Sequence, residues 1–272
     1  MLSILSMICL YLINHGTLWE HSVLQVAHVC NTYIHSRLQP ETPSMTQSGL
    51  WIIGYGSLIF KPPPLYAFRV VGTLNGYIRR FWQSSSDHRG TPQAPGRVVT
   101  LVSLEDLKEN PQFHDDVHEF EFSGQQTDLA SLSELDLTVW CVAYYIEPKN
   151  VDEVKEYMDV REQDGYSTHT VHFNVHEAPD MCPIASEVLA QLPKDITGEL
   201  QIESTVYIGT IQNESFVGPE SLAKTAEVIR TSKGPSGKNI EYLRCLTEAV
   251  LGLDNQGGSH DPYLEQLLER SW

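Results

Sequence analysis

One glutamate, Glu162, is placed where its carboxylate could accept a proton. It continues the apolar stripe of a predicted helix, in which Val151, Val154 and Met158 recur at steps of three and four residues. Partial burial and the negative end of the helix dipole both raise the pKa of a carboxyl group. A glutamate of raised pKa suits general base catalysis, but a frayed helix end or a structural pair with Arg161 explains the same position.

The segment WIIGYGSLIF, residues 51–60, contains two glycines, which leave the backbone without side chains. Two apolar runs of strand-favouring residues flank Gly54 and Gly56. A glycine inside a strand pattern marks either a bulge or a close approach of the backbone to another group. The segment alone leaves both interpretations open.

Four other motifs contain suitable residue types but fail on spacing. In GYGSLI, Ile59 stands where a dinucleotide-binding GxGxxG motif has its third glycine. GPSGKN (residues 234–239) lacks the four-residue spacer and the hydroxyl residue of a phosphate loop. HDDVH (114–118) has no closed set of metal ligands. SSSDHRG (84–90) places its residues too close in sequence for a hydrolase triad, so a polar turn is expected there.

Charge and cysteine content narrow the class of protein. The formal net charge of -17, without a cluster of Lys and Arg, argues against a nucleic-acid partner. The five cysteines lie far apart, form no CxxC pair, and are odd in number, which fits no disulfide framework. These features predict a soluble globular protein of a reducing compartment, the cytoplasm.

Residues 1–48 are predicted to be an extension, and Met45 is an alternative first residue if the start is misassigned. The apolar stretch LSILSMICLYLI is shorter than the ~20 residues that span a bilayer. A signal peptide is the minority interpretation, because the first Lys or Arg of the chain is Arg37. Apolar residues at helical spacing favour an amphipathic helix over residues 17–35.

Residues 49–272 are predicted to form one domain, in which strands mostly precede helices. Strand patterns occur at residues 51–53, 77–85, 97–104, 139–146, 168–175 and 204–210. Helical patterns follow the capping box of Asn150 and Glu153, begin at Gly218-Pro219, occupy residues 240–250, and follow Asp261-Pro262. This order favours the α+β class, with a strongly curved sheet or small barrel instead of repeated βαβ units.

Residues 105–138 form an acidic insertion within this domain. Ten acidic residues there accompany one lysine, Lys108, and the apolar residues show no long period. Such a composition predicts a solvated excursion from the fold. We therefore expect that deleting roughly residues 108–136 leaves the domain folded and active.

Taken together, several segments resemble the ChaC-type γ-glutamylcyclotransferases, a family that acts on glutathione. The resemblance rests on GYGSLIF (54–60), RRFWQSSSDHRGTPQAPGRVVTLV (79–102), DVREQDGY (159–166), YIGT with FVGP, and GPSGKNIEYL (234–243). It extends from about residue 51 to the C-terminus, with interruptions at residues 105–138 and 176–200.

The resemblance implies a mostly antiparallel β-barrel with flanking helices, no metal and no cofactor. It also implies cleavage of glutathione to 5-oxoproline and cysteinylglycine. The catalytic glutamate of the family falls on Glu162, and Gln163-Asp164 follows it where the family commonly has Lys-Gly. The substrate-binding loop falls on Gly54, Tyr55, Gly56, Ser57, Leu58 and Ile59.

In the implied reaction, the nucleophile is the substrate's own α-amine, and Glu162 accepts its proton. Backbone N–H groups of the glycine loop would bind the substrate's α-carboxylate or the developing oxyanion. Asp87, Arg89 and Tyr207 are secondary candidates for orienting the peptide, with structural roles as the alternative. Two other functions stay open: a cyclotransferase for other γ-glutamyl amino acids or amines, and a non-catalytic module that binds a γ-glutamyl compound.

Overall fold

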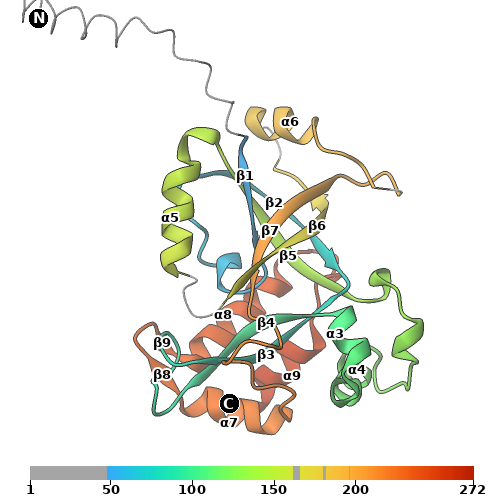
Figure 1. Ribbon diagram of the computed structural model, residues 1–272, viewed down its shortest axis with the longest axis vertical. Coiled ribbons are helices and arrows are strands. Elements are labelled where there is room, and N and C mark those ends of the chain that lie inside the picture. Colours follow the sequence, from blue (N-terminus) through green and yellow to red (C-terminus); the bar gives the residue numbers. More distant parts are fainter. Residues whose placement is uncertain (1–47, 162–165, 180–181, 196) are drawn as a thin grey trace, which may run out of the picture. The chain divides into compact units, whose positions relative to one another are not determined.

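The computed structural model describes residues 48–161, 166–179, 182–195 and 197–272 (Figure 1). The predicted extension with its amphipathic helix lies outside the described residues, except for Ser48, and so do Glu162, Gln163 and Asp164. Residues Ser48–Trp272 cluster into one unit. Within the described residues, none of the helices is both long and apolar enough to cross a membrane.

In the described part of the chain, five strands close into a barrel in the order β1-β5-β2-β6-β7 (Figure 1). Their bounds are β1 (Leu50–Gly54), β2 (Tyr66–Asn75), β5 (Thr138–Ile146), β6 (Ser167–Glu177) and β7 (Gln201–Ile208). Neighbouring strands are antiparallel, except where β1 meets β7 in parallel at Ile52 and Thr205. The predicted curved, mostly antiparallel barrel is confirmed.

A long hairpin of β3 (Tyr77–Ser85) and β4 (Gly96–Ser103) forms a separate sheet, and helices flank both sheets. Outside residues 104–137, the described α-helices are α5 (Val151–Arg161), α6 (Pro183–Leu189), α7 (Leu222–Thr231), α8 (Asn239–Leu251) and α9 (Pro262–Arg270). The strands β8 (Lys233–Gly234) and β9 (Gly237–Lys238) join α7 to α8. Helices α7, α8 and α9 pack together beside the long hairpin, whereas α5 lies beside the barrel (Figure 1).

Two predicted elements differ from the structure. Strand β2 is absent from the predicted strands, although it lies between β5 and β6 in the barrel. Its buried residues form a nearly continuous run, which lacks the alternation of a half-exposed strand. The helix predicted to begin at Gly218-Pro219 begins instead at Leu222, because the hydroxyl of Ser221 accepts a hydrogen bond from the backbone N–H of Lys224 and caps it.

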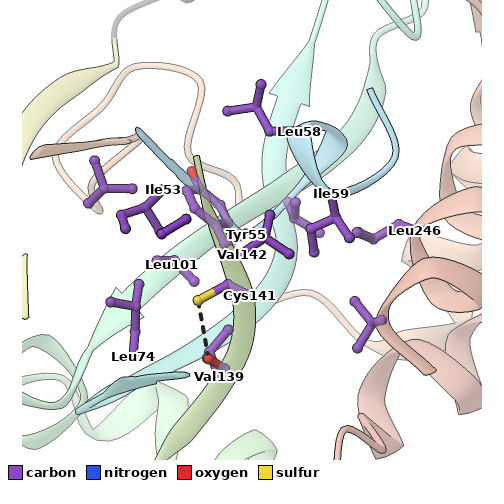
Figure 2. Close-up of a cluster of buried hydrophobic side chains, with 14 of the residues drawn as sticks. Ile53, Tyr55, Leu58, Ile59, Leu74, Leu101, Val139, Cys141, Val142 and Leu246 are labelled. Carbon is purple, nitrogen blue, oxygen red and sulfur yellow. Dashed lines mark hydrogen bonds between the residues drawn. The ribbon is translucent and has the colours of Figure 1, made fainter. Parts of the chain in front are cut away.

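The barrel core continues into the segment that follows β1. Tyr55, Leu58 and Ile59 are buried in the same apolar cluster as Leu74 and Val142 (Figure 2). The second apolar run of the segment was predicted to favour a strand, but residues Ser57–Ile59 form a 3-10 turn, η1. The turn folds these side chains back into the core, so burial decides their conformation.

The prediction that residues 105–138 form a solvated excursion is wrong. The segment folds into α3 (Leu104–Glu109), α4 (His114–Phe120) and 3-10 turns. Its residues Leu107, Phe113 and Val117 are buried in a second apolar cluster together with Trp82 of β3. The rings of Trp82 and Phe113 stack with centroids 5.4 Å apart. Short helices joined by turns bury apolar residues without a sustained period, which explains the error.

A buried charge also ties this insertion to the long hairpin. Arg80 of β3 is 1% exposed, and its Nε lies 2.6 Å from Oδ1 of Asp116, while Nη2 lies 2.8 Å from Oε1 of Glu121. Burial alone would lower the pKa of Arg80, but these two carboxylates raise it above its usual value. The acids of the insertion are therefore partly counter-ions for the domain.

Removing residues 1–44 is expected to leave the domain folded and active. The described unit starts at Ser48, and the first strand, β1, starts at Leu50. A protein that begins at Met45 should show the same melting temperature and turnover as the full chain, because it keeps every described strand, helix and core residue. Insolubility or loss of turnover in the shortened protein would contradict this.

Candidate active site

Close packing explains the two glycines that follow β1. A Cβ atom on Gly54 would lie 2.7 Å from Cβ of Leu58, and one on Gly56 would lie 2.8 Å from Cγ2 of Val99. Strand β1 keeps a regular register with β5 as far as Gly54, opposite Val142. The glycines therefore mark a close approach of the backbone, and the bulge interpretation is wrong.

Gly56→Ala is expected to lower both stability and activity. The new methyl group must displace the stiff side chain of Val99, and overpacking of this kind costs about 1–3 kcal/mol. Gly252→Ala is the matched control, because its Cβ would meet nothing closer than 3.5 Å. Thermal unfolding and turnover should change in the first variant and stay near the original values in the second. Equal effects of the two substitutions would contradict the packing argument.

A two-lobed pocket lies beside this loop. The larger lobe has a volume of about 310 Å³ and the smaller one of about 60 Å³. Ser57, Tyr166 and Tyr242 line both lobes, so the two lobes adjoin. The site is assembled from segments far apart in the sequence: the loop after β1, the end of α5, and α8.

The structure brings most of the predicted site residues together. Residues lining the smaller lobe include Tyr55, Gly56, Ser57, Leu58 and Tyr207, and those lining the larger lobe include Asp87 and Arg89. Gly54 and Ile59 line neither lobe; they are buried, and Ile59 belongs to the apolar core.

The predicted catalytic residue, Glu162, lies outside the described residues. The described residues on either side of that gap, Arg161 and Tyr166, both line the larger lobe. The chain segment that contains Glu162 is therefore bounded at both ends by residues of the pocket.

Hydrogen bonds fix the end of α5 and the glycine loop to one another and to the barrel. Nη2 of Arg161 donates to Oγ of Ser57 over 2.7 Å. The hydroxyl of Tyr55 donates to the carbonyl oxygen of Tyr207 over 2.9 Å, and the hydroxyl of Tyr207 donates to Asp159 of α5 over 3.2 Å. These contacts hold the smaller lobe in place from three elements.

The larger lobe is rich in positive charge, although the chain is strongly acidic. Its described lining contains Lys61, Arg89 and Arg161, with Asp87 as the one described carboxylate. Arg89 is 7% exposed, and its guanidinium carbon lies 5.4 Å from the ring centroid of Tyr242. Burial lowers the pKa of Arg89. This lining suits a ligand with carboxylate groups.

Catalysis by a cysteine nucleophile and catalysis by a bound metal find little support among the described residues. Cys141 is buried in the barrel core, where its thiol donates to the carbonyl oxygen of Val139 (Figure 2). Burial raises the pKa of this thiol to about 12, so it is a poor nucleophile. Within the described ranges, no three His, Cys, Asp or Glu side chains gather as a metal site requires.

Sequence reasoning missed several residues of the pocket lining, including Gln83 and Tyr242. Gln83 of β3 lines the larger lobe, and Tyr242 of α8 lines both lobes. Both lie inside segments on which the family resemblance rests, and that was the available signal. Their side chains meet the glycine loop only through tertiary packing, which no local pattern reveals.

The closed, mostly antiparallel barrel with flanking helices is the fold class of the γ-glutamylcyclotransferases. The chain belongs to the ChaC-like protein family, whose model matches residues 50–271. The predicted family membership is confirmed.

Individual relatives are similar over most of their length. The glutathione-specific gamma-glutamylcyclotransferase of Saccharomyces cerevisiae is 44% identical over 226 residues, which cover 82% of this chain and 95% of the relative. Glutathione-specific gamma-glutamylcyclotransferase 1 of Homo sapiens is 32% identical, with 77% and 80% covered. A crystal structure of a yeast gamma glutamyl cyclotransferase specific to glutathione matches with a TM-score of 0.75 at 43% identity, covering 82% of this chain and 96% of the other.

Proposed function

We propose that this chain is a glutathione-specific γ-glutamylcyclotransferase, which converts glutathione to 5-oxoproline and cysteinylglycine without a metal or cofactor. The observation that carries the proposal is the pocket, in which the glycine loop adjoins a lobe lined by Lys61, Arg89 and Arg161. Glutathione has two carboxylates and one ammonium group at neutral pH, so a cationic lining complements its charge. The named relatives support the same substrate.

The smaller lobe is the proposed site of the γ-glutamyl half. Backbone N–H groups of the loop residues that line this lobe, Tyr55 to Leu58, would bind its α-carboxylate, with the hydroxyl of Ser57 as a further donor. Arg161 donates to Ser57 and places a positive charge beside this anion. Enclosure in a lobe of about 60 Å³ would favour a folded-back conformer, in which the α-amine approaches the side-chain carbonyl carbon.

Glu162 is the proposed general acid and base. It would take a proton from the α-ammonium group, and the freed amine nitrogen would then attack the γ-carbonyl carbon. The bond between this carbon and the cysteine nitrogen breaks. The proton held by Glu162 and the second proton that the attacking nitrogen loses as it becomes the lactam N–H both end on the departing nitrogen, which leaves as the ammonium group of cysteinylglycine. The positions of Arg161 and Tyr166 in the pocket lining support this role.

We place this reaction in a reducing compartment, the cytoplasm. Cys141, Cys182 and Cys245 are free in the described part of the chain, which supports such a compartment. Reduced glutathione is the form that the proposed reaction consumes.

The experiment that tests the function compares three substrates on the purified full chain. Glutathione, γ-glutamylalanine and a γ-glutamylamine are each incubated with the protein, and 5-oxoproline is measured. Preferential release from glutathione supports the proposal. Faster release from either of the other compounds would assign the enzyme to another γ-glutamyl substrate. No release from any of them, combined with measurable glutathione binding, would favour a binding module.

A further inference from the structure

Gln83 has an unused hydrogen-bonding capacity inside the pocket. Its side chain is 1% exposed and lines the larger lobe. Among the described residues, neither Oε1 nor Nε2 of this amide has a hydrogen-bond partner. A buried amide without partners costs about 1–3 kcal/mol, so a stable fold seldom keeps one without a reason. Because the amide has both a donor and an acceptor free, it matches a ligand with the complementary pair.

Arg89 is a second residue of the same lobe whose side chain can bind a further group. Its guanidinium group donates to the carbonyl oxygen of Lys238 over 3.1 Å and lies over the ring of Tyr242. The carboxylate of Glu241 is near enough to oppose the lowering of the Arg89 pKa, but in the described part of the chain no carboxylate forms an ion pair with this almost fully buried guanidinium. A buried cation of this kind favours an anionic ligand, because the ligand supplies the missing counter-charge.

The shape of the pocket indicates which part of a ligand meets these two residues. The smaller lobe of about 60 Å³ contacts the glycine loop, and the larger lobe of about 310 Å³ adjoins it at Ser57, Tyr166 and Tyr242. Given the proposed function, the γ-glutamyl half occupies the smaller lobe. The remainder of the substrate then extends into the larger lobe, where Gln83 and Arg89 lie.

We propose that Gln83 and Arg89 form the subsite for the leaving half of the substrate. Gln83 binds the terminal glycine residue of the substrate: its Oε1 accepts from the N–H of the peptide group between cysteine and glycine, and its Nε2 donates to an oxygen of the glycine carboxylate. Arg89 binds the C-terminal glycine carboxylate. This inference rests on the proposed function and deepens it, because it names the groups that select a γ-glutamyl dipeptide with a free C-terminus over a single γ-glutamyl amino acid.

The first test varies the substrate and leaves the protein unchanged. The values of kcat/KM are measured for glutathione, for glutathione esterified at its glycine carboxylate, and for γ-glutamylcysteine. The ester removes the anion that Arg89 binds, and γ-glutamylcysteine lacks the terminal glycine residue that Gln83 binds. Each analogue is expected to react about 10- to 100-fold less efficiently than glutathione, as for loss of a hydrogen bond that leaves a buried group unpaired.

The second test removes the amide by Gln83→Leu, which keeps side-chain volume. Efficiency toward glutathione should fall about 10- to 100-fold, whereas efficiency toward γ-glutamylcysteine should change little, so the preference between the two disappears. The melting temperature should stay equal or rise, because the substitution removes an unpartnered buried polar group. Thr225→Val is the matched control: Thr225 is also fully buried with an unpartnered hydroxyl, but it lines neither lobe.

Arg89→Gln completes the design, since it should abolish the difference between glutathione and its ester. If this variant does not fold, the ester comparison on the unchanged protein still decides the role of Arg89. An ester used as well as glutathione, or a Gln83→Leu protein that keeps its preference for glutathione, would overturn the subsite while leaving the proposed function intact. A chain that releases no 5-oxoproline from glutathione would overturn both.

Discussion

Glu162→Gln is expected to lower kcat for glutathione by about 10²–10⁴-fold, the usual contribution of a positioned acid–base group. Glutamine keeps the size of the side chain and can still form hydrogen bonds, but it cannot accept the proton of the α-ammonium group. Glutathione affinity should change little, because the glycine loop and Arg161 would bind the γ-glutamyl carboxylate independently. The melting temperature should also stay the same.

Glu156→Gln is the control for this substitution. Glu156 is an exposed residue of α5 and does not line either lobe, so its replacement removes the same charge away from the pocket. The control should retain full turnover. A structural role for Glu162 would give the reverse pattern, with a lower melting temperature and normal turnover per folded molecule. Near-normal kcat in a well-folded Glu162→Gln protein would refute the mechanism.

Deleting residues 108–136 is expected to abolish folding, contrary to the expectation from composition. The deletion removes Phe113 and Val117 from the second apolar cluster and exposes Trp82, which is fully buried in the intact chain. It also removes both carboxylates that neutralise Arg80. Loss of one partner of a buried ion pair commonly costs about 3–5 kcal/mol, a large fraction of the stability of a domain. The deleted protein should be insoluble or show no cooperative unfolding transition.

A pair of single substitutions tests the same claim in a folded protein. Asp116→Ala should lower the free energy of unfolding by about 3 kcal/mol, because Arg80 stays buried with one carboxylate fewer. Asp115→Ala removes the neighbouring, exposed acid of α4 and should change stability by less than about 0.5 kcal/mol. Chemical denaturation of both variants measures the difference. Equal free energies of unfolding for the two variants, or an active protein that lacks residues 108–136, would show that the insertion is dispensable.

Local sequence patterns predicted most of the barrel because its strands carry clear apolar runs between turn residues. Strands β1, β3, β4, β5, β6 and β7 were expected at close to their observed positions. Strand β2 was missed because it is buried between two neighbours and lacks alternation. The insertion was misjudged because its ten acids suggested solvation, whereas Asp116 and Glu121 are counter-ions of a buried arginine. The identity of a counter-ion depends on tertiary contacts that charge counts do not contain.

Site residues could be predicted where one short segment of sequence contains them. They could not be predicted where the site is formed by side chains from segments far apart in the sequence. Gly54 and Gly56 stood out because glycine in a strand pattern is informative by itself. Gln83 did not stand out, because its proposed role depends on the burial of its side-chain amide in the pocket without a hydrogen-bond partner. Tyr242 likewise reaches the pocket only because α8 packs beside η1. Such residues become visible only when burial and hydrogen bonding are known.

The central claim is that the substrate's own amine, and not water, attacks the γ-glutamyl carbonyl. Turnover of glutathione in water enriched in oxygen-18, followed by mass spectrometry of the products, tests this most directly. The mechanism predicts 5-oxoproline without incorporated oxygen-18, in equal amount to cysteinylglycine, and no free glutamate. Glutamate with oxygen-18 in its γ-carboxylate as the initial product would show hydrolysis and contradict the account.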